Sequence, residues 1–331
     1  MLRVAQQTLL GDAMPETTAT RWHRPLLWVS AAMAALAVIS AIGLVVDPRE
    51  LVGAPAWAKP LKFALSVGVY CVTLSWLIGL LPRFKRAGWW LGTVAAAFLL
   101  VEIVVIVGAV AFNTTSHFNV TTPFHTAVWA VMAVSIVLVW VAAIPIVIVL
   151  LRSTLGDEAR TIAIRAGFVL ALVGMALAFF MTSPTAEQLS NYQGIAGAHS
   201  VGTADGGPGL PLLGWSTVGG DLRVPHFLGM HALQVLPLAA FALERLASTV
   251  RVLNQRKLRA RLMWIFAIVY AGALVILTGQ ALAGESVVRP GAAVIVSTAL
   301  LLAGAAIAIG ASVTRAGSSA HPARARVEAK I

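Results

Sequence analysis

The stretch from Asp221 to Gln234, DLRVPHFLGMHALQ, places acidic, basic and histidine side chains at the beginning of an otherwise apolar segment. Ionisable side chains inside a membrane span are costly, and they usually face the interior of a helix bundle. His226 and His231 are five residues apart, which is about 140° around a helix, so they do not form one ligand pair. We expect His226 to face the adjoining loop or His125, and His231, which shares a face with Gln234, to face Glu102.

Glu102 lies in the apolar run Leu100-Val-Glu-Ile-Val-Val, about 14 Å from the nearer helix end at 1.5 Å per residue. A carboxylate at this depth would be strongly unfavourable against lipid. We interpret Glu102 as protonated, paired with His231 or bound to a cation. Glu102 and His231 are therefore the candidate catalytic groups, as proton carrier, general base or ligand. The alternative for Glu102 is a structural hydrogen bond to a neighbouring helix.

Several interpretations of this polar layer stay open. Two neutral imidazoles on facing helices could ligate a haem; His125 with His226 is the best-matched pair, with His231 as a substitute. The same histidines with Glu102 or Asp221 could bind a transition metal such as Zn, Cu, Fe or Mn. A polar site without metal, and histidines that only bond loop carbonyls and lipid headgroups, are the remaining alternatives.

Basic residues flank the same end of the predicted bundle. Asp221 and Arg223 are expected to form an ion pair that anchors the loop to the helix, or Arg223 binds a carboxylate or phosphate. Lys59 and Lys62 flank another span and either extend to lipid headgroups or form, with Arg223, a basic rim for an anion.

The composition indicates an all-α polytopic membrane protein. Of 331 residues, 59% are hydrophobic and 11% are charged, with a mean hydropathy of +0.87. The net charge of +11 reflects basic loops and not nucleic-acid binding. The lone Cys71 excludes an intrachain disulfide. Apolar runs near the length that crosses a bilayer predict eight spans, roughly 26–46, 62–82, 88–111, 124–149, 163–182, 226–244, 262–282 and 291–311.

The distribution of basic residues predicts the orientation. Nineteen of the 24 lysines and arginines fall in the segments that would then be cytoplasmic, which places both termini in the cytoplasm. Each span that runs inward begins with a proline, a residue favoured in the first helical turn. The spacings of Pro60 to Pro123 and of Pro225 to Pro290 are similar, and two four-helix halves in parallel orientation are one interpretation.

Three regions follow from this topology. Residues 1–25 form a cytoplasmic segment, residues 26–311 the transmembrane domain, and residues 312–331 a basic tail that we expect to be disordered. The outer loop 183–225 contains nine glycines and several apolar residues. A loop of this length is usually functional or disordered, and its apolar content favours a lid over the bundle.

The segments Gly197–Gly202, Asp205–Pro211, Gly214–Thr217 and Gly220–Gln234 resemble a group of uncharacterised bacterial membrane proteins. The resemblance covers about an eighth of the chain plus the helix pattern. It implies a bacterial plasma membrane, and it carries over no functional residues.

Three functions are consistent with these features, and whether the protein is an enzyme stays open. The first is a metal- or haem-dependent redox protein. The second is a binding or transport protein for a small anion or a lipid-like molecule, with Glu102 and His231 as a proton relay. The third is a structural or assembly subunit. In each case the lipid bilayer is a partner, and a small-molecule or metal ligand would arrive from the outer side.

Overall fold

The computed structural model describes the backbone of residues 21–328 and the side chains of residues 21–317. It contains eight helices that are long and apolar enough to cross a membrane, which confirms the predicted all-α, multi-pass fold. These helices are α1 (Arg24–Val46), α2 (Ala58–Gly79), α3 (Lys85–Ala111), α4 (Pro123–Leu151), α5 (Glu158–Leu177), α8 (Arg223–Leu246), α9 (Arg256–Leu282) and α10 (Ala292–Glu328).

The remaining elements are short and lie in the connections. The turns α6 (Phe179–Thr182) and α7 (Ala186–Ser190) follow α5, and a 3₁₀ turn (Arg251–Asn254) precedes α9. Strand β1 (Glu50–Leu51) pairs with β2 (Ala54–Pro55), and β3 (Ser200–Val201) pairs with β4 (Gly220–Asp221), both in antiparallel fashion. We call residues 183–222 the long loop, and the end of the bundle where it lies the long-loop end.

Local sequence explains where several helices begin. The Thr122 hydroxyl accepts a hydrogen bond from the first turn of α4, and Pro123 is its first residue. Asp157 caps α5 in the same way. Pro60 and Pro225 are the third residues of α2 and α8. The observed α2 begins four residues before the predicted span, so Lys59 belongs to the helix.

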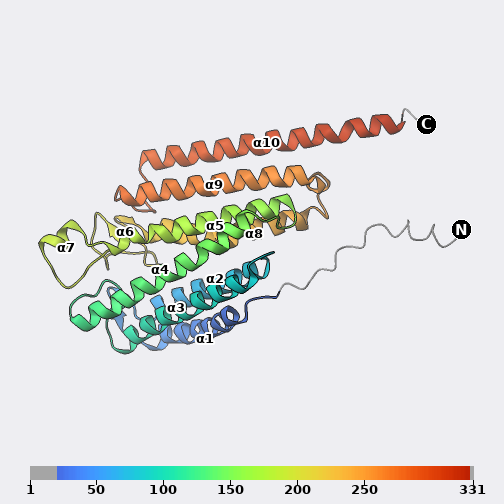
Figure 1. Cartoon of the computed structure of the whole chain (residues 1–331). Helices are drawn as coiled ribbons and strands as arrows, with labels where there is room; N and C mark the ends of the chain where they lie inside the picture. Colours follow the sequence, from blue (N-terminus) through green and yellow to red (C-terminus); the bar gives the residue numbers. More distant parts are fainter. Residues whose placement is uncertain (1–20, 329–331) are drawn as a thin grey trace.

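The long helices form two groups of four that pack in the same order (Figure 1). In the first group, α1 packs on α2, α2 on α3, and α3 on α4. In the second group, α5 packs on α8, α8 on α9, and α9 on α10. Helix α4 crosses from α3 to α5, and α2 touches α8, so these contacts join the two groups. The four-by-four arrangement agrees with the two-half interpretation of the proline spacing.

Apolar side chains pack differently in different parts of the bundle. One core cluster contains large side chains of the first group, such as Leu77, Leu99 and Ile146, and continues into the second group through Phe168 of α5 and Leu233 of α8. Between α5 and α8 the packing depends on small residues. A Cβ on Gly174 would lie 2.4 Å from the carbonyl carbon of Gly229, so the two backbones are in direct contact. Close approach through small residues is a common means of helix association in membranes.

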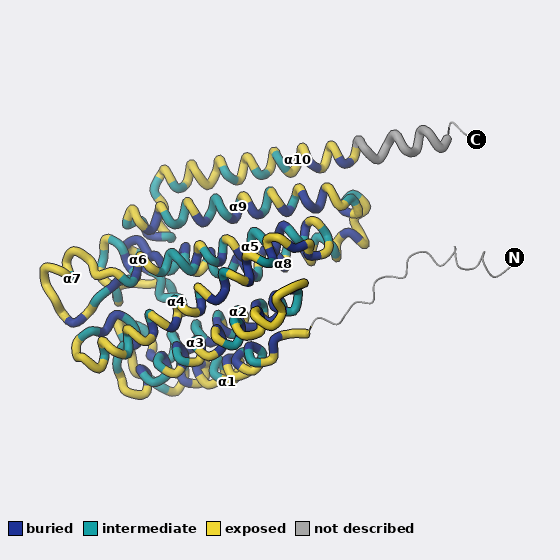
Figure 2. Tube along the Cα trace, viewed as in Figure 1, coloured by how far each residue is buried: buried dark blue, intermediate teal, exposed yellow. Residues whose placement is uncertain are grey.

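Helix α10 differs from the sequence prediction and from the other spans. It continues as helix to Glu328, where we expected a disordered tail from residue 312; this segment is rich in alanine and arginine, which favour helix. Figure 2 shows α10 exposed along most of its described length, with α9 between it and the other helices. Residues 1–20 of the predicted N-terminal segment lie outside the described residues.

Candidate functional site

A cavity of 340 Å³ lies between the two helix groups at the long-loop end. Its walls come from α2 and α3, from α4 and α5, from α8 and from the long loop. The predicted site residues that line it are Lys59, Lys62, Glu102, Arg223, His226, His231 and Gln234. His117, His199 and Tyr70 line the same space.

Two of the predicted site residues do not line the cavity. His125 lies at the start of α4, where its Nδ1 atom is within hydrogen-bond distance of the hydroxyl groups of Thr122 (2.9 Å) and Thr121 (3.2 Å). Asp221 is buried behind Arg223, to which it is paired. The structure therefore does not bring His125 and His226 together as facing ligands.

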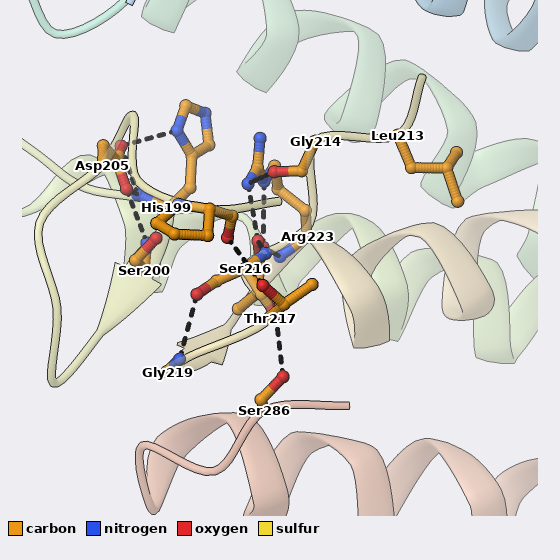
Figure 3. Close-up of polar contacts among 12 residues, drawn as sticks. His199, Ser200, Asp205, Leu213, Gly214, Ser216, Thr217, Gly219, Arg223 and Ser286 are labelled. Carbon is orange, nitrogen blue, oxygen red and sulfur yellow. Dashed lines mark hydrogen bonds and ion pairs between the residues drawn. The ribbon is translucent and has the colours of Figure 1, made fainter. Parts of the chain in front are cut away.

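The long loop holds Arg223 in place through Asp221 and Gly214; Figure 3 shows Arg223 beside Gly214 and Ser216 of the loop. The Asp221 carboxylate accepts hydrogen bonds from Arg223 Nε (2.9 Å) and Nη2 (2.5 Å) and from the backbone N–H of Ser216 (2.8 Å). Arg223 Nη2 also donates to the carbonyl of Gly214 (2.6 Å). The Ser286 hydroxyl, beyond α9, donates to the Ser216 carbonyl (2.9 Å). The loop is therefore a packed cover tied to α8 and to the α9–α10 connection.

Lys62 joins the same network from the other helix group. Its Nζ donates to the carbonyl of Leu213 (2.8 Å), one residue before Gly214. A Cβ on Gly214 would lie 3.8 Å from Lys62 Nζ and 3.9 Å from Arg223 Nη1, so both cations surround this glycine. We call Lys59, Lys62 and Arg223 the cation cluster. It brings the starts of α2 and α8 to one point.

The cation cluster lies at the starts of two helices, a position that disfavours cations. Lys59 and Lys62 lie within the first five residues of α2, and Arg223 is the first residue of α8. A helix N-terminus carries a partial positive charge, so cations are disfavoured there and anions are favoured. Glu102 is the one carboxylate among the described residues that line the cavity. Lys59 makes no hydrogen bond to another described residue, and its ammonium group is therefore available for a ligand.

Three buried polar atoms in the cavity wall lack hydrogen-bond partners among the described residues. They are Glu102 Oε1, the Tyr70 hydroxyl and His231 Nε2. Glu102 is 4% exposed, so no large opening to solvent replaces the missing partner. Buried polar groups are nearly always hydrogen-bonded, and exceptions require an explanation such as a water or a ligand. The clustering of three such atoms makes this cavity the candidate site.

The floor of the cavity connects the two helix groups. His231 Nδ1 lies 3.3 Å from Gln234 Oε1, and Gln234 Nε2 donates to the hydroxyl of Thr73 in α2 (3.2 Å). His226 faces another direction, as the helical spacing predicts: its Nδ1 donates to the Gly174 carbonyl in α5 (2.7 Å). The two histidines therefore contact different partners: His226 bonds to α5, and His231 lies against Gln234 of its own helix.

His199 and His117 were less evident in the sequence because both lie in loops. His199 Nδ1 donates to Asp205 Oδ2 (2.7 Å), and Asp205 also accepts from the backbone of His199 and Ser200 (Figure 3). Burial lowers the pKa of His199 and outweighs the contact with Asp205. Burial, and then the positive charge of Lys59, lowers the pKa of His117 well below its ordinary value. Both imidazoles are therefore neutral at pH 7 and do not add to the positive charge.

Ring contacts hold His117 between aromatic side chains. Its ring lies 5.3 Å from that of Trp129 and 5.9 Å from that of Phe63, centroid to centroid. Phe118 separates His117 from His199, with its ring 4.8 Å from that of His199. The only sequence signal for these residues was that His117 and His199 fell, with three other histidines, on the predicted outer side.

Among the described residues, the cavity contains no preassembled metal site. Within residues 21–317, no three histidine, cysteine, aspartate or glutamate side chains lie close enough together to hold a metal ion. The set predicted from the sequence (His125, His226, His231 and Glu102) is divided, because His125 lies outside the cavity. Metal or haem binding stays a prediction.

Comparison with protein-family models, with curated protein sequences and with solved structures finds no match to this chain. The resemblance of the Gly197–Gln234 region to a bacterial membrane protein group thus stays a prediction.

Proposed function

We propose that this protein binds a small anion in the cavity beneath the long loop and transports it across a bacterial plasma membrane. The observation that carries the proposal is the cation cluster, with three basic side chains and a single carboxylate around one cavity. The bias of basic residues towards the opposite end of the bundle supports an orientation with the long loop outside and both termini in the cytoplasm.

The preferred ligand carries a carboxylate or a phosphate. Arg223 is oriented by Asp221 and Gly214, and this arrangement supports directional hydrogen bonds to oxygen atoms. Lys59 has no competing hydrogen bond and provides a charge that can follow ligands of different shape. Asp221 offsets the charge of Arg223, so the two lysines supply the uncompensated charge that attracts the anion.

Transport, as distinct from binding alone, is supported by the location of the cavity. Many transporters bind their substrate at the interface between two structurally similar halves and move the halves relative to each other. Here the cavity lies between two four-helix groups with the same packing order. Glu102 and His231, with unpartnered buried atoms, are the candidates for a proton relay coupled to that movement.

Binding is tested on purified protein held in amphipol, with titration calorimetry of acetate, dodecanoate and inorganic phosphate, and with uncharged dodecanol as a ligand control. We expect Lys59→Met to weaken binding of the preferred anion about tenfold, because a hydrogen bond to a charged group contributes roughly 1.5–3 kcal/mol. The matched control is Lys85→Met, at the exposed first residue of α3. Equal affinity of the wild type and Lys59→Met for every anion, or no binding at all, contradicts the proposal.

Transport is tested separately in proteoliposomes. Glu102→Gln keeps the shape of the side chain and removes its ionisation, so we expect uptake of the bound anion to lose its dependence on a pH gradient. Retention of the full gradient dependence would exclude Glu102 from proton coupling while leaving anion binding intact.

Metal- or haem-dependent redox activity and a structural role are the competing functions. A visible absorption spectrum and a metal assay on the purified protein distinguish the first from transport. The structural role predicts wild-type behaviour of a His226→Ala, His231→Ala double variant in every binding and uptake measurement.

A further inference from the structure

The cavity has two chemically different parts. The part at the long-loop end contains the cation cluster, together with His117 and His199. The other part lies between α4 and α5 and is lined by apolar side chains. A small inorganic anion would occupy only the first part. The second part therefore requires a separate explanation.

The apolar part is formed by one face of each helix. On α4 the lining residues Trp129, Ala133, Ile136 and Trp140 recur at intervals of three or four, so they lie on one side of the helix over about 16 Å. On α5 and α6 the lining residues are Ala171, Met175 and Phe179, each four apart. The apolar lining therefore extends along both helices instead of being confined to one turn.

Aromatic contacts mark one boundary of this space. The rings of Trp140 and Phe179 meet at 5.9 Å, and the Trp140 indole N–H donates to the Leu172 carbonyl (3.1 Å). Ile136 is 40% exposed and Phe179 is 43% exposed, although both line the cavity. These side chains are therefore incompletely covered by protein, and the hydrocarbon of a ligand or of the bilayer can cover the remainder.

We propose that the ligand is a single-chain amphiphilic anion, with its carboxylate or phosphate at the cation cluster and its hydrocarbon tail between α4 and α5. The inference rests on the proposed function, because the cation cluster must first bind the head. The positive charge of the cation cluster favours an anionic head. The apolar side chains of α4 and α5 favour a hydrocarbon tail. A volume of 340 Å³ is at the lower end of the range for small-molecule sites, which favours one chain over two.

Chain length is the direct test, with titration calorimetry of butanoate, octanoate and dodecanoate in amphipol. Each CH₂ group transferred from water into an apolar site increases affinity by about fourfold. We expect affinity to rise along the series by up to this factor per CH₂. Dioctanoyl phosphatidic acid, which has two chains, should bind more weakly than dodecyl phosphate, which has one.

Obstruction of the apolar part is the second test. Ile136→Trp should weaken dodecanoate binding at least tenfold and leave butanoate binding unchanged. The matched control is Val134→Trp, two residues away on the opposite side of α4, where the side chain is 58% exposed and does not line the cavity. If Ile136→Trp fails to fold, Ala133→Leu obstructs the same face with a smaller side chain.

The outcomes separate the two proposals. Equal affinity for butanoate and dodecanoate, or an equal effect of Ile136→Trp on both, overturns the amphiphilic ligand and leaves anion binding intact. Preference for the two-chain lipid overturns the single-chain assignment. Loss of all anion binding, or insensitivity of all binding to Lys59→Met, overturns the proposed function and this inference together.

Discussion

The two four-helix groups share one packing order but contribute differently to the cavity. Each group begins its second helix at the site: α2 carries Lys59 and Lys62, whereas α8 carries Arg223. Arg223 is constrained by Asp221 and Gly214, while Lys59 makes no hydrogen bond to a described residue. The second group thus provides a rigid, oriented cation, and the first group provides an available one.

The fourth helices of the two groups also differ. Helix α4 leaves its own group and crosses to α5, where it closes one side of the cavity (Figure 1). Helix α10 packs against α9 and stays at the periphery (Figure 2). Both α2 and α4 therefore join the two groups and line this cavity, whereas α10 contributes no residue to it.

The largest expected effect comes from the ion pair before α8. Asp221 is 2% exposed, so Asp221→Ala leaves the Arg223 charge and the Ser216 N–H without their partner. Breaking a pair of this kind costs about 3 kcal/mol, which thermal unfolding in detergent would detect as a lower Tm. The control is Asp47→Ala, which removes the more exposed pair with Arg49 before α2 and should cost less. Equal losses would show that the two helix starts are equally rigid.

A smaller effect is expected where helices touch through glycine. Gly174→Ala places a methyl group against the backbone of Gly229, and overpacking of this kind costs roughly 1–3 kcal/mol. In the first group, a Cβ on Gly68 would lie 3.3 Å from Met33 Cβ, so Gly68→Ala needs a shift of a few tenths of an ångström. We expect Gly174→Ala to lower the Tm more than Gly68→Ala does. The reverse order would mean that α1 and α2 form the more rigid helix pair.

The hydrogen bond from Gln234 to Thr73 should contribute still less. Gln234→Leu removes a contact between α8 and α2, and one hydrogen bond contributes about 0.5–1.5 kcal/mol. A double-mutant cycle with Thr73→Val measures this coupling in Tm and in anion affinity. A coupling energy near zero would show that the two groups are not joined at this point.

The most gradual change is expected with pH, at one loop within each group. The folded protein keeps His117 and His199 neutral, because burial lowers the pKa of both side chains. In the unfolded chain they gain protons at about pH 6.5. Stability should therefore decrease as the pH falls through 6.5, seen as a falling Tm. His117→Gln should flatten this dependence; an unchanged profile would assign the effect to other groups.

Much of the fold could be predicted because it depends on local composition. The eight spans, the prolines in the first turns of α2, α4 and α8, and the divergence of His226 and His231 follow from apolar run length and helical periodicity. The helix α10 continues beyond residue 311 to Glu328, within the segment for which the basic composition led us to expect disorder.

The candidate site was predicted only in outline. Lys59, Lys62, Arg223, Glu102 and His231 meet in one cavity, but His125 does not. Depth along a helix can be estimated from residue counts, whereas the direction in which a side chain faces depends on how neighbouring helices cross. The pairing of His199 with Asp205 depends on the path of an irregular loop, for which the sequence has no periodic signal.

Residue type and order are therefore sufficient to predict eight apolar helices, and to place five of the seven histidines near the end opposite most of the basic residues. Those properties depend on residue type and spacing within single segments. Only the tertiary structure decided that α4 crosses to α5, that three cations gather beneath the long loop, and that Glu102, Tyr70 and His231 keep buried atoms unpaired in the same cavity. These features arise from contacts between segments far apart in the chain. The close packing of several helices determines where each of these side chains lies.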